Sequence, residues 1–186
     1  MKTKLRTRTL TTHHLLALIL LLDLPVLLAQ NSPASPGAGQ PPLIATPDKA
    51  AKAFDEVATK ALAAMKTRAG ELSIQGVAVI AYVEGDNVTA WSSKMTVVGT
   101  LKTAPSEKDP GANLLAIAYT KAAEMADTLK ASGSGVRPPM KGEFGWQGGL
   151  VKKGKTGYLI AAFSGGKSED DVKVSQAGLD VLDTAL

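Results

Sequence analysis

The sequence contains no cysteine, which excludes a disulfide framework, a thiol nucleophile, an iron–sulfur centre and a lipoprotein anchor. Aromatic residues make up only 4% of the chain, and the two histidines, His13 and His14, both lie near the N-terminus. Zinc and redox-metal sites are built mainly from histidine and cysteine side chains. The remainder of the chain offers neither ligand, so we predict no such metal centre.

The first 29 residues follow the pattern of a secretory signal peptide. A basic start precedes the apolar run Leu15–Leu22, and Ala29 supplies the small residue of a cleavage site. A membrane anchor is the alternative, but Asp23 and Pro25 interrupt the apolar stretch, which is also shorter than the roughly 20 residues that span a bilayer. We predict that residues 1–29 are removed and that the protein is exported to the periplasm or secreted.

The formal net charge of +4 belongs largely to this segment. Residues 1–29 hold four of the 21 basic residues and one of the 17 acidic residues, so 17 bases and 16 acids remain after cleavage, a net charge of +1. Nucleic acids and anionic membranes attract proteins with a marked excess of basic residues. The processed protein is therefore predicted to bind neither nucleic acid nor a membrane.

Two regions follow the signal segment. Residues 30–45 are rich in proline, glycine and serine and lack an apolar period, as is typical of a disordered tether. Residues 46–186 have the length of a single domain.

Three segments of this domain have helical periodicity. The first helix is predicted to begin at Thr46-Pro47 and to end at Gly70, the second to cover 112–130, and the third to open with the capping pattern of Ser168 and Asp171. The predicted buried positions are Phe54, Val57, Ala58, Ala61, Leu62 and Met65 in the first helix, Leu115, Ala118, Ala122, Met125 and Leu129 in the second, and Val172, Ser175, Leu179, Leu182 and Leu186 in the third.

Two hairpins separate these helices. Residues 74–83 are apolar on both faces and predict a central strand, which a turn joins to a second strand over 88–98. Residues 99–110 are predicted to be a loop, and the later hairpin pairs 149–151 with 156–163. Consecutive hairpins imply an α+β fold with an antiparallel sheet of about four to five strands, helices packed on it and the order α-β-β-α-β-β-α.

Two stretches of sequence stand out, Gly148–Leu182 and Asn113–Ala126, and together they resemble the GlcG/HbpS-like family of haem-binding and related small domains. Gly148–Leu182 is similar to the family's Gly-Gly segment, hairpin turn, apolar strand, Ser-Gly-Gly exit and acid-led terminal helix. Asn113–Ala126 is similar to the family's helix around a Lys-Ala pair, here Lys121-Ala122. The resemblance implies the α+β fold, haem as a ligand and assembly into a homo-oligomer.

The chain also departs from this family. Val151 stands where the family commonly has proline, and Met95 alone remains of an Arg-Met-Asp-Gly-Ala segment. Some members ligate haem through histidine, but both histidines of this chain lie in the predicted signal peptide. Histidine ligation therefore does not carry over.

The segment Ser164-Gly165-Gly166 leaves two interpretations open. It is either a tight turn from strand to helix or a cradle for an anion at a helix N-terminus. No histidine base is available to activate Ser164, so we predict no catalytic residue there. The acids Glu169, Asp170 and Asp171 complement the helix dipole better than they would hold calcium.

If haem binds, a tyrosinate or a thioether must serve as the donor to iron, or the macrocycle is held only by apolar contacts and by bases such as Lys121 or Arg137 near its propionates. Tyr119 is the preferred donor, because it lies at the edge of a predicted helix face next to Lys121. The large residues Met140, Phe144 and Trp146 have three possible roles: the apolar wall of a ligand pocket, an oligomer contact, or packing onto their own domain.

The sequence thus favours an exported, non-catalytic binding protein for haem or a related apolar small molecule. The alternative is a structural or accessory oligomerisation module that has no ligand. An enzyme is less favoured because no catalytic constellation is present, although a fold alone never decides function.

Overall fold

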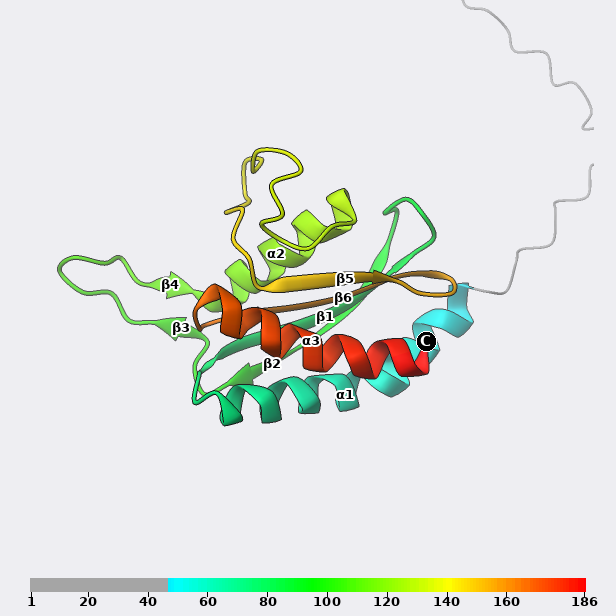
Figure 1. Cartoon of the computed structure of the whole chain (residues 1–186), viewed down its shortest axis with the longest axis horizontal. Helices are drawn as coiled ribbons and strands as arrows, with labels where there is room; N and C mark the ends of the chain where they lie inside the picture. Colours follow the sequence, from blue (N-terminus) through cyan, green and yellow to red (C-terminus); the bar gives the residue numbers. More distant parts are fainter. Residues whose placement is uncertain (1–46) are drawn as a thin grey trace, which may run out of the picture. The chain divides into compact units, whose positions relative to one another are not determined.

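The structure, a computed structural model, describes residues 47–186, and it confirms the predicted α+β fold (Figure 1). The predicted signal peptide, the predicted tether and Thr46 lie outside the described residues. In this part of the chain no helix is both long and apolar enough to cross a membrane. The elements are α1 (Pro47–Glu71), β1 (Gly76–Glu84), β2 (Trp91–Val98), β3 (Lys102–Thr103), β4 (Ala112–Asn113), α2 (Leu114–Thr128), β5 (Gly149–Lys153), β6 (Gly157–Ser164) and α3 (Ser168–Ala185).

The main sheet has four antiparallel strands in the order β2-β1-β6-β5. Val79 at the middle of β1 lies opposite Met95 on one side and Ala162 on the other. Every residue of β1 from Gly76 to Val83 is buried, which confirms the prediction of a central strand. The order α-β-β-α-β-β-α is therefore correct for the main elements.

The helices cover both faces of this sheet (Figure 1). Alternate residues of β1 point to opposite faces, so Ile80 packs in one core with α1 and α3, whereas Val79 packs in a second core with α2. The largest side chains of the first core include Phe54, Met65 and Phe163.

The prediction of a plain loop over 99–110 is wrong. Strands β3 and β4 form a short ladder there, with Lys102 opposite Asn113, and they project from the body as an arm (Figure 1). Strands of two residues have no detectable period, which is why the sequence pattern missed them. Asn113 also fixes the start of α2, because its side chain accepts a hydrogen bond from the backbone N–H of Ala116 at 3.0 Å.

The predicted helix faces are correct at most positions. Leu179 and Leu182 are buried as predicted, but Leu129 is only half-buried because it ends α2 in the left-handed conformation, with φ 53°. In α3, Val174 is buried in place of Val172, which is half-buried.

Candidate functional site

The structure distributes the predicted site residues over three regions around α2. The first is a buried junction that joins α2, the end of β6 and the start of α3, and it contains Lys121, Ser164, Gly165 and Gly166. The second is a groove between α2 and the β1–β2 connection, near Tyr119. The third is the loop 130–147, which carries Arg137, Met140, Phe144 and Trp146.

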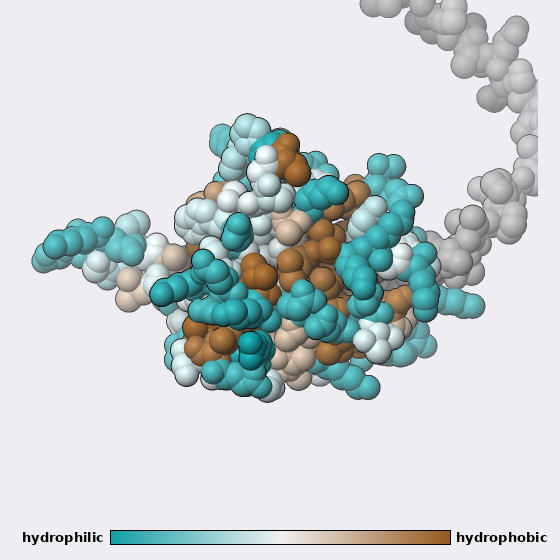
Figure 2. Space-filling model, viewed as in Figure 1, coloured by the Kyte–Doolittle hydropathy of each residue, from teal (hydrophilic) through white to brown (hydrophobic). Residues whose placement is uncertain are grey.

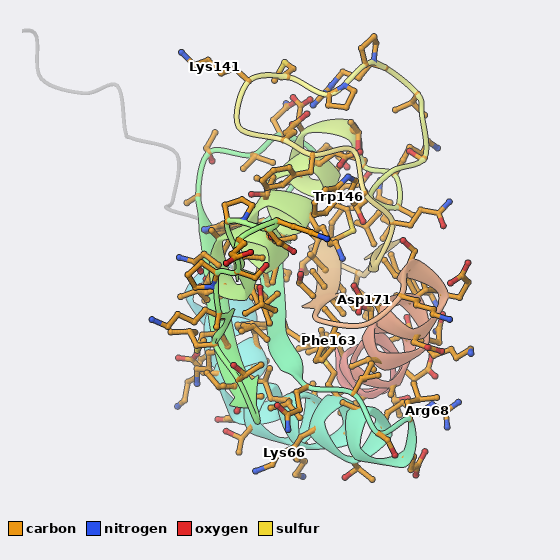
Figure 3. All side chains as sticks on the ribbon, turned by 90° about the vertical axis from the view of Figure 1, so that its left-hand side faces the viewer. Lys66, Arg68, Lys141, Trp146, Phe163 and Asp171 are labelled. Atoms are coloured by element: carbon orange, nitrogen blue, oxygen red, sulfur yellow. The ribbon has the colours of Figure 1, made fainter. Side chains whose placement is uncertain are left out.

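An ion pair lies at the centre of the junction. The Lys121 ammonium donates to the Asp171 carboxylate and to the backbone carbonyl of Phe163, both at 2.8 Å. The Lys121 and Asp171 side chains are each only 4% exposed. Figure 3 shows Phe163 and Asp171 in this part of the domain. Lys121 is therefore enclosed by protein and held by its own partners, away from any ligand at the surface.

Burial acts on both members of this pair. Removal from water lowers the pKa of Lys121 and raises the pKa of Asp171, while their mutual attraction and hydrogen bond oppose both shifts. A buried pair of this kind tolerates the loss of both partners better than the loss of one, because the remaining charge is left unpaired.

The glycines of the junction allow the backbone to approach these groups. Gly165 has φ 154°, and a Cβ there would overlap the backbone oxygen of Gln75. A Cβ at Gly148 would overlap the Lys121 ammonium. Positive φ at Gly165 confirms the predicted glycine turn from strand to helix.

The predicted serine cap of α3 is wrong. Lys167 is the N-cap, without a side-chain bond, and Asp171 instead reaches back to accept a hydrogen bond from the Gly166 N–H at 2.8 Å. The protein's own carboxylate thus occupies the place at which an anion cradle would hold its ligand. The turn interpretation of Ser164-Gly165-Gly166 accounts for this geometry, and Ser164 itself is buried.

The groove lies where the β1–β2 connection passes the second half of α2. It has a volume of about 390 Å³ and is lined by Val88, Thr89, Ala90, Trp91, Ala123, Ala126 and Asp127. Small alanine side chains on α2 leave this space open. Val88 and Trp91 are 46% and 36% exposed, so the groove presents apolar surface to solvent.

Tyr119 lies beside this groove but is not part of its lining. Its ring centroid is 6.3 Å from that of Trp91, and its hydroxyl is 3.3 Å from the Ser93 hydroxyl. The sequence analysis selected Tyr119 and missed Trp91. Trp91 is the first residue of β2, and its exposure depends on how α2 packs beside it. The alternation of residues along the strand does not indicate that exposure.

The loop 130–147 exposes its large apolar residues. Met140, Phe144 and Trp146 are 54%, 49% and 51% exposed, and Val136 is 57% exposed. The rings of Phe144 and Trp146 stack with centroids 4.7 Å apart. Of the three predicted roles, packing onto their own domain does not describe these residues.

Arg137 is held between two carboxylates. It donates to both oxygens of Glu143, at 2.6 and 2.8 Å, and twice to one oxygen of Asp127, at 3.0 and 2.6 Å. These bonds raise the pKa of Arg137, and they lower the pKa of Glu143 to about 2, with a further contribution from the Met140 N–H. The guanidinium is thus already paired with two protein carboxylates, so it is not available to bind the propionates of a haem.

Two further contacts attach the loop to the domain. The buried Glu124 accepts a hydrogen bond from the Gly133 N–H at 2.9 Å, and Ser132 accepts one from the Gly149 N–H at 2.9 Å. The second carboxylate oxygen of Glu124 is buried and has no hydrogen-bond partner among the described residues. Across residues 47–186, no three acidic, histidine or cysteine side chains converge as metal ligands would.

Comparison with known proteins gives similarity to solved structures alone. No protein-family model and no curated protein matches the chain. Among solved structures, the chain is similar to the Klebsiella pneumoniae protein ORFY of the DUF336 family, a GlcG-like family. The sequence identity is 20% and the TM-score 0.44, and the match covers 70% of this chain and 90% of that one. At this level the similarity assigns neither a family nor a function to the chain.

Proposed function

We propose that this chain is an exported, non-catalytic protein that binds a small, largely apolar molecule in the groove between α2 and the β1–β2 connection. One observation carries the proposal: an exposed tryptophan, Trp91, faces a space bordered by Val88, Ala123 and Ala126. Its volume of about 390 Å³ lies within the range of small-molecule sites, roughly 300–1,000 Å³.

The groove suits a flat ligand better than a chain-like one. An aromatic ligand would stack on Trp91, with the edge of Tyr119 close by, and the alanines of α2 would form the opposite wall. Asp127 is the one charged residue of the lining, and Arg137 already neutralises it. The site therefore favours ligands with little charge on the part that enters.

Haem is the first ligand to test because of the family resemblance. No histidine lies beyond residue 14, so a tyrosinate or a thioether would have to bind the iron, and Tyr119 is the donor that we propose, with its hydroxyl exchanging Ser93 for the metal. Lys121 and Arg137 are engaged with protein carboxylates and do not supply partners for the propionates. Apolar contact in the groove would then contribute most of the affinity.

The test is a titration of the exported protein with haemin, followed by its visible spectrum, and with a neutral aromatic dye, followed by fluorescence. Ala123→Leu fills the groove from an exposed position and should weaken binding roughly ten-fold. The matched control is Ala116→Leu, at an exposed position of the same helix outside the groove lining. Tyr119→Phe should shift the haem spectrum and leave the melting temperature nearly unchanged. No saturable change with either probe rules out this function.

The second candidate function is an oligomerisation module, and the edge strand β2 favours it. In the described sheet β2 pairs only with β1, so its outer backbone groups remain free to pair with β2 of a second copy around a two-fold axis. Val97 on β2 is 38% exposed, and Leu101, at the base of the projecting arm, is 43% exposed.

Sedimentation equilibrium tests this candidate. If β2 forms the contact, Val97→Lys should shift the protein from oligomer to monomer without changing probe binding in the groove. A wild-type protein that is monomeric at all concentrations eliminates this candidate.

A further inference from the structure

The loop 130–147 exposes its large apolar side chains and pairs charged side chains against the domain. Two of its four charged residues, Arg137 and Glu143, bind each other, and Arg137 also binds Asp127 of α2. Its large apolar residues are about half exposed to solvent, and Figure 2 shows apolar surface on the loop. Surface loops of soluble proteins normally turn their large apolar side chains toward the domain and their charged side chains toward solvent, because burying apolar surface is favourable. This arrangement indicates that the outer side of the loop meets an apolar medium.

The polar frame beneath the loop fixes this orientation. Arg137 joins Asp127 of α2 to Glu143, and Glu143 also accepts a hydrogen bond from the Met140 N–H at 2.8 Å. Gly133 is tied to Glu124 in the same way. The apolar side chains are therefore displayed by a defined loop conformation, so little ordering is needed when they bind.

The size of the exposed surface distinguishes between partners. Val136, Met140, Phe144 and Trp146 together expose on the order of a few hundred Å². A standard protein interface buries about 800 Å² on each partner, which is more than this loop offers. Insertion of a few side chains into the edge of a bilayer requires no larger surface, and tryptophan in particular concentrates at that depth.

The charges at the margin of the loop have one sign. Lys130 and Lys141 are exposed, and neither forms an ion pair with a described residue, whereas the acids Asp127 and Glu143 are both paired with Arg137. Figure 3 shows Lys141 extending outward from the loop. The loop as a whole lies beyond α2, on the side of the sheet away from α1 and α3 (Figure 1).

We propose that the loop 130–147 docks the domain on the surface of an anionic lipid membrane, with Phe144 and Trp146 at the level of the headgroups and with Lys130 and Lys141 against lipid phosphates. The sequence analysis predicted no membrane binding from a net charge of +1. Net charge is the wrong measure here, because only charges within a screening length of the bilayer, about 10 Å, contribute. The docking surface is separate from the groove residues Val88 and Trp91, so either proposal can fail alone.

The experiment uses the exported form of the protein and vesicles of phosphatidylcholine with or without phosphatidylglycerol. Binding to the anionic vesicles should saturate and should be roughly ten-fold tighter than binding to the neutral ones. In a Trp91→Phe background Trp146 is the sole tryptophan. Its fluorescence should then shift to shorter wavelength on binding, and brominated acyl chains should quench it.

Variants separate lipid insertion from other contacts. Phe144→Ser combined with Trp146→Ser should abolish binding to both kinds of vesicle, and Lys141→Glu should weaken binding to the anionic vesicles alone. Val97→Ser removes an exposed apolar side chain of β2, outside the loop, and should leave vesicle binding unchanged even if it alters self-association through β2. All variants are made in the same exported form, so any contribution from the N-terminal segment is common to them. Melting curves should match the wild type because the substituted side chains are exposed.

Two results overturn the proposal. One is vesicle binding that is absent in the wild type or that survives the double substitution. The other is a double variant that loses self-association, measured by sedimentation, in a protein that never bound vesicles, which would identify the loop as a contact between copies.

Discussion

Two ion-pair networks involve helix α2, and they differ in how far their side chains are exposed to solvent. In the junction, Lys121 and Asp171 are each 4% exposed and connect three elements of the core. In the loop, Arg137 is 25% exposed and joins Glu143 to Asp127, which is 54% exposed. The same chemistry of base and carboxylate therefore serves two purposes.

The difference between the networks is one of energetics. A buried charge that loses its partner has no water to replace it, so the junction should be sensitive to any single substitution. Charges at the surface recover hydration when a partner is removed, so the loop contacts should add little to global stability. The junction is therefore a structural device, whereas the loop network fixes the conformation of one segment. Four predictions test this contrast.

The largest effect is expected from Lys121→Met. It leaves Asp171 buried without its partner and should reduce the free energy of unfolding by roughly 3–5 kcal/mol, measured by urea denaturation. Lys121→Met combined with Asp171→Leu should be less destabilising than the single change. The control Arg137→Met should lower stability far less, and equal losses in the two single variants would contradict the contrast.

Leu179→Ala should have the next largest effect. Leu179 is 5% exposed in the core between α1, α3 and the sheet, so the cavity should cost roughly 2–5 kcal/mol. Leu129→Ala, at the half-buried end of α2 just before the loop, should cost clearly less. A loss below about 0.5 kcal/mol at Leu179 would mean that α3 does not dock as described.

Gly165→Ala should be destabilising by about 1–3 kcal/mol, because the added Cβ overlaps the Gln75 backbone and the φ of 154° is unfavourable. Gly135→Ala in the loop is the matched change: its φ is also positive, at 72°, but no atom lies within 4 Å of the added Cβ. Thermal unfolding of both variants isolates the effect of the close approach. Similar melting temperatures would show that the junction is less tightly packed than described.

The smallest effect on global stability concerns the loop at low pH. The pKa of Glu143 is about 2, below its ordinary value of 4.5, so its stabilising contact with Arg137 is fully present above pH 4.5 and is lost as the pH falls through 2. Limited proteolysis with an acid-stable protease should therefore find the loop protected at pH 4 and cleaved near pH 2. Glu143→Gln should be cleaved at both pH values, and a loop that is cut equally at both in the wild type would contradict the assignment.

The sequence predicted the strands and the helix periods well where a residue pattern repeats over many positions. The apolar run of β1 from Val77 to Val83 and the stripe from Phe54 to Met65 could only be buried, because no arrangement leaves them in water at low cost. The β3–β4 arm was missed because two-residue strands have no period. The helical period also concealed the burial of Lys121, since its partner Asp171 lies 50 residues away in the chain.

The candidate site was predicted less well than the fold. Nine residues were selected from the sequence, and the structure places them in three separate regions. Trp91 was missed because it becomes a candidate binding residue only through its position beside α2. Lys121 and Arg137 were expected to face a ligand, but they pair with protein carboxylates.

By itself, then, the sequence determined the alternation of helices and hairpins, the central place of β1 and the glycine turn at Gly165, because each of these follows from local periodicity or backbone conformation. Only the tertiary structure decided which charges are buried and which apolar residues stay exposed. Both depend on contacts between different segments of the chain. Asp171 of α3 pairs with the buried Lys121, and Glu124 and Asp127 of α2 hold the loop in the conformation that exposes its apolar residues. Such pairings are set by packing geometry, and no pattern along the chain encodes them.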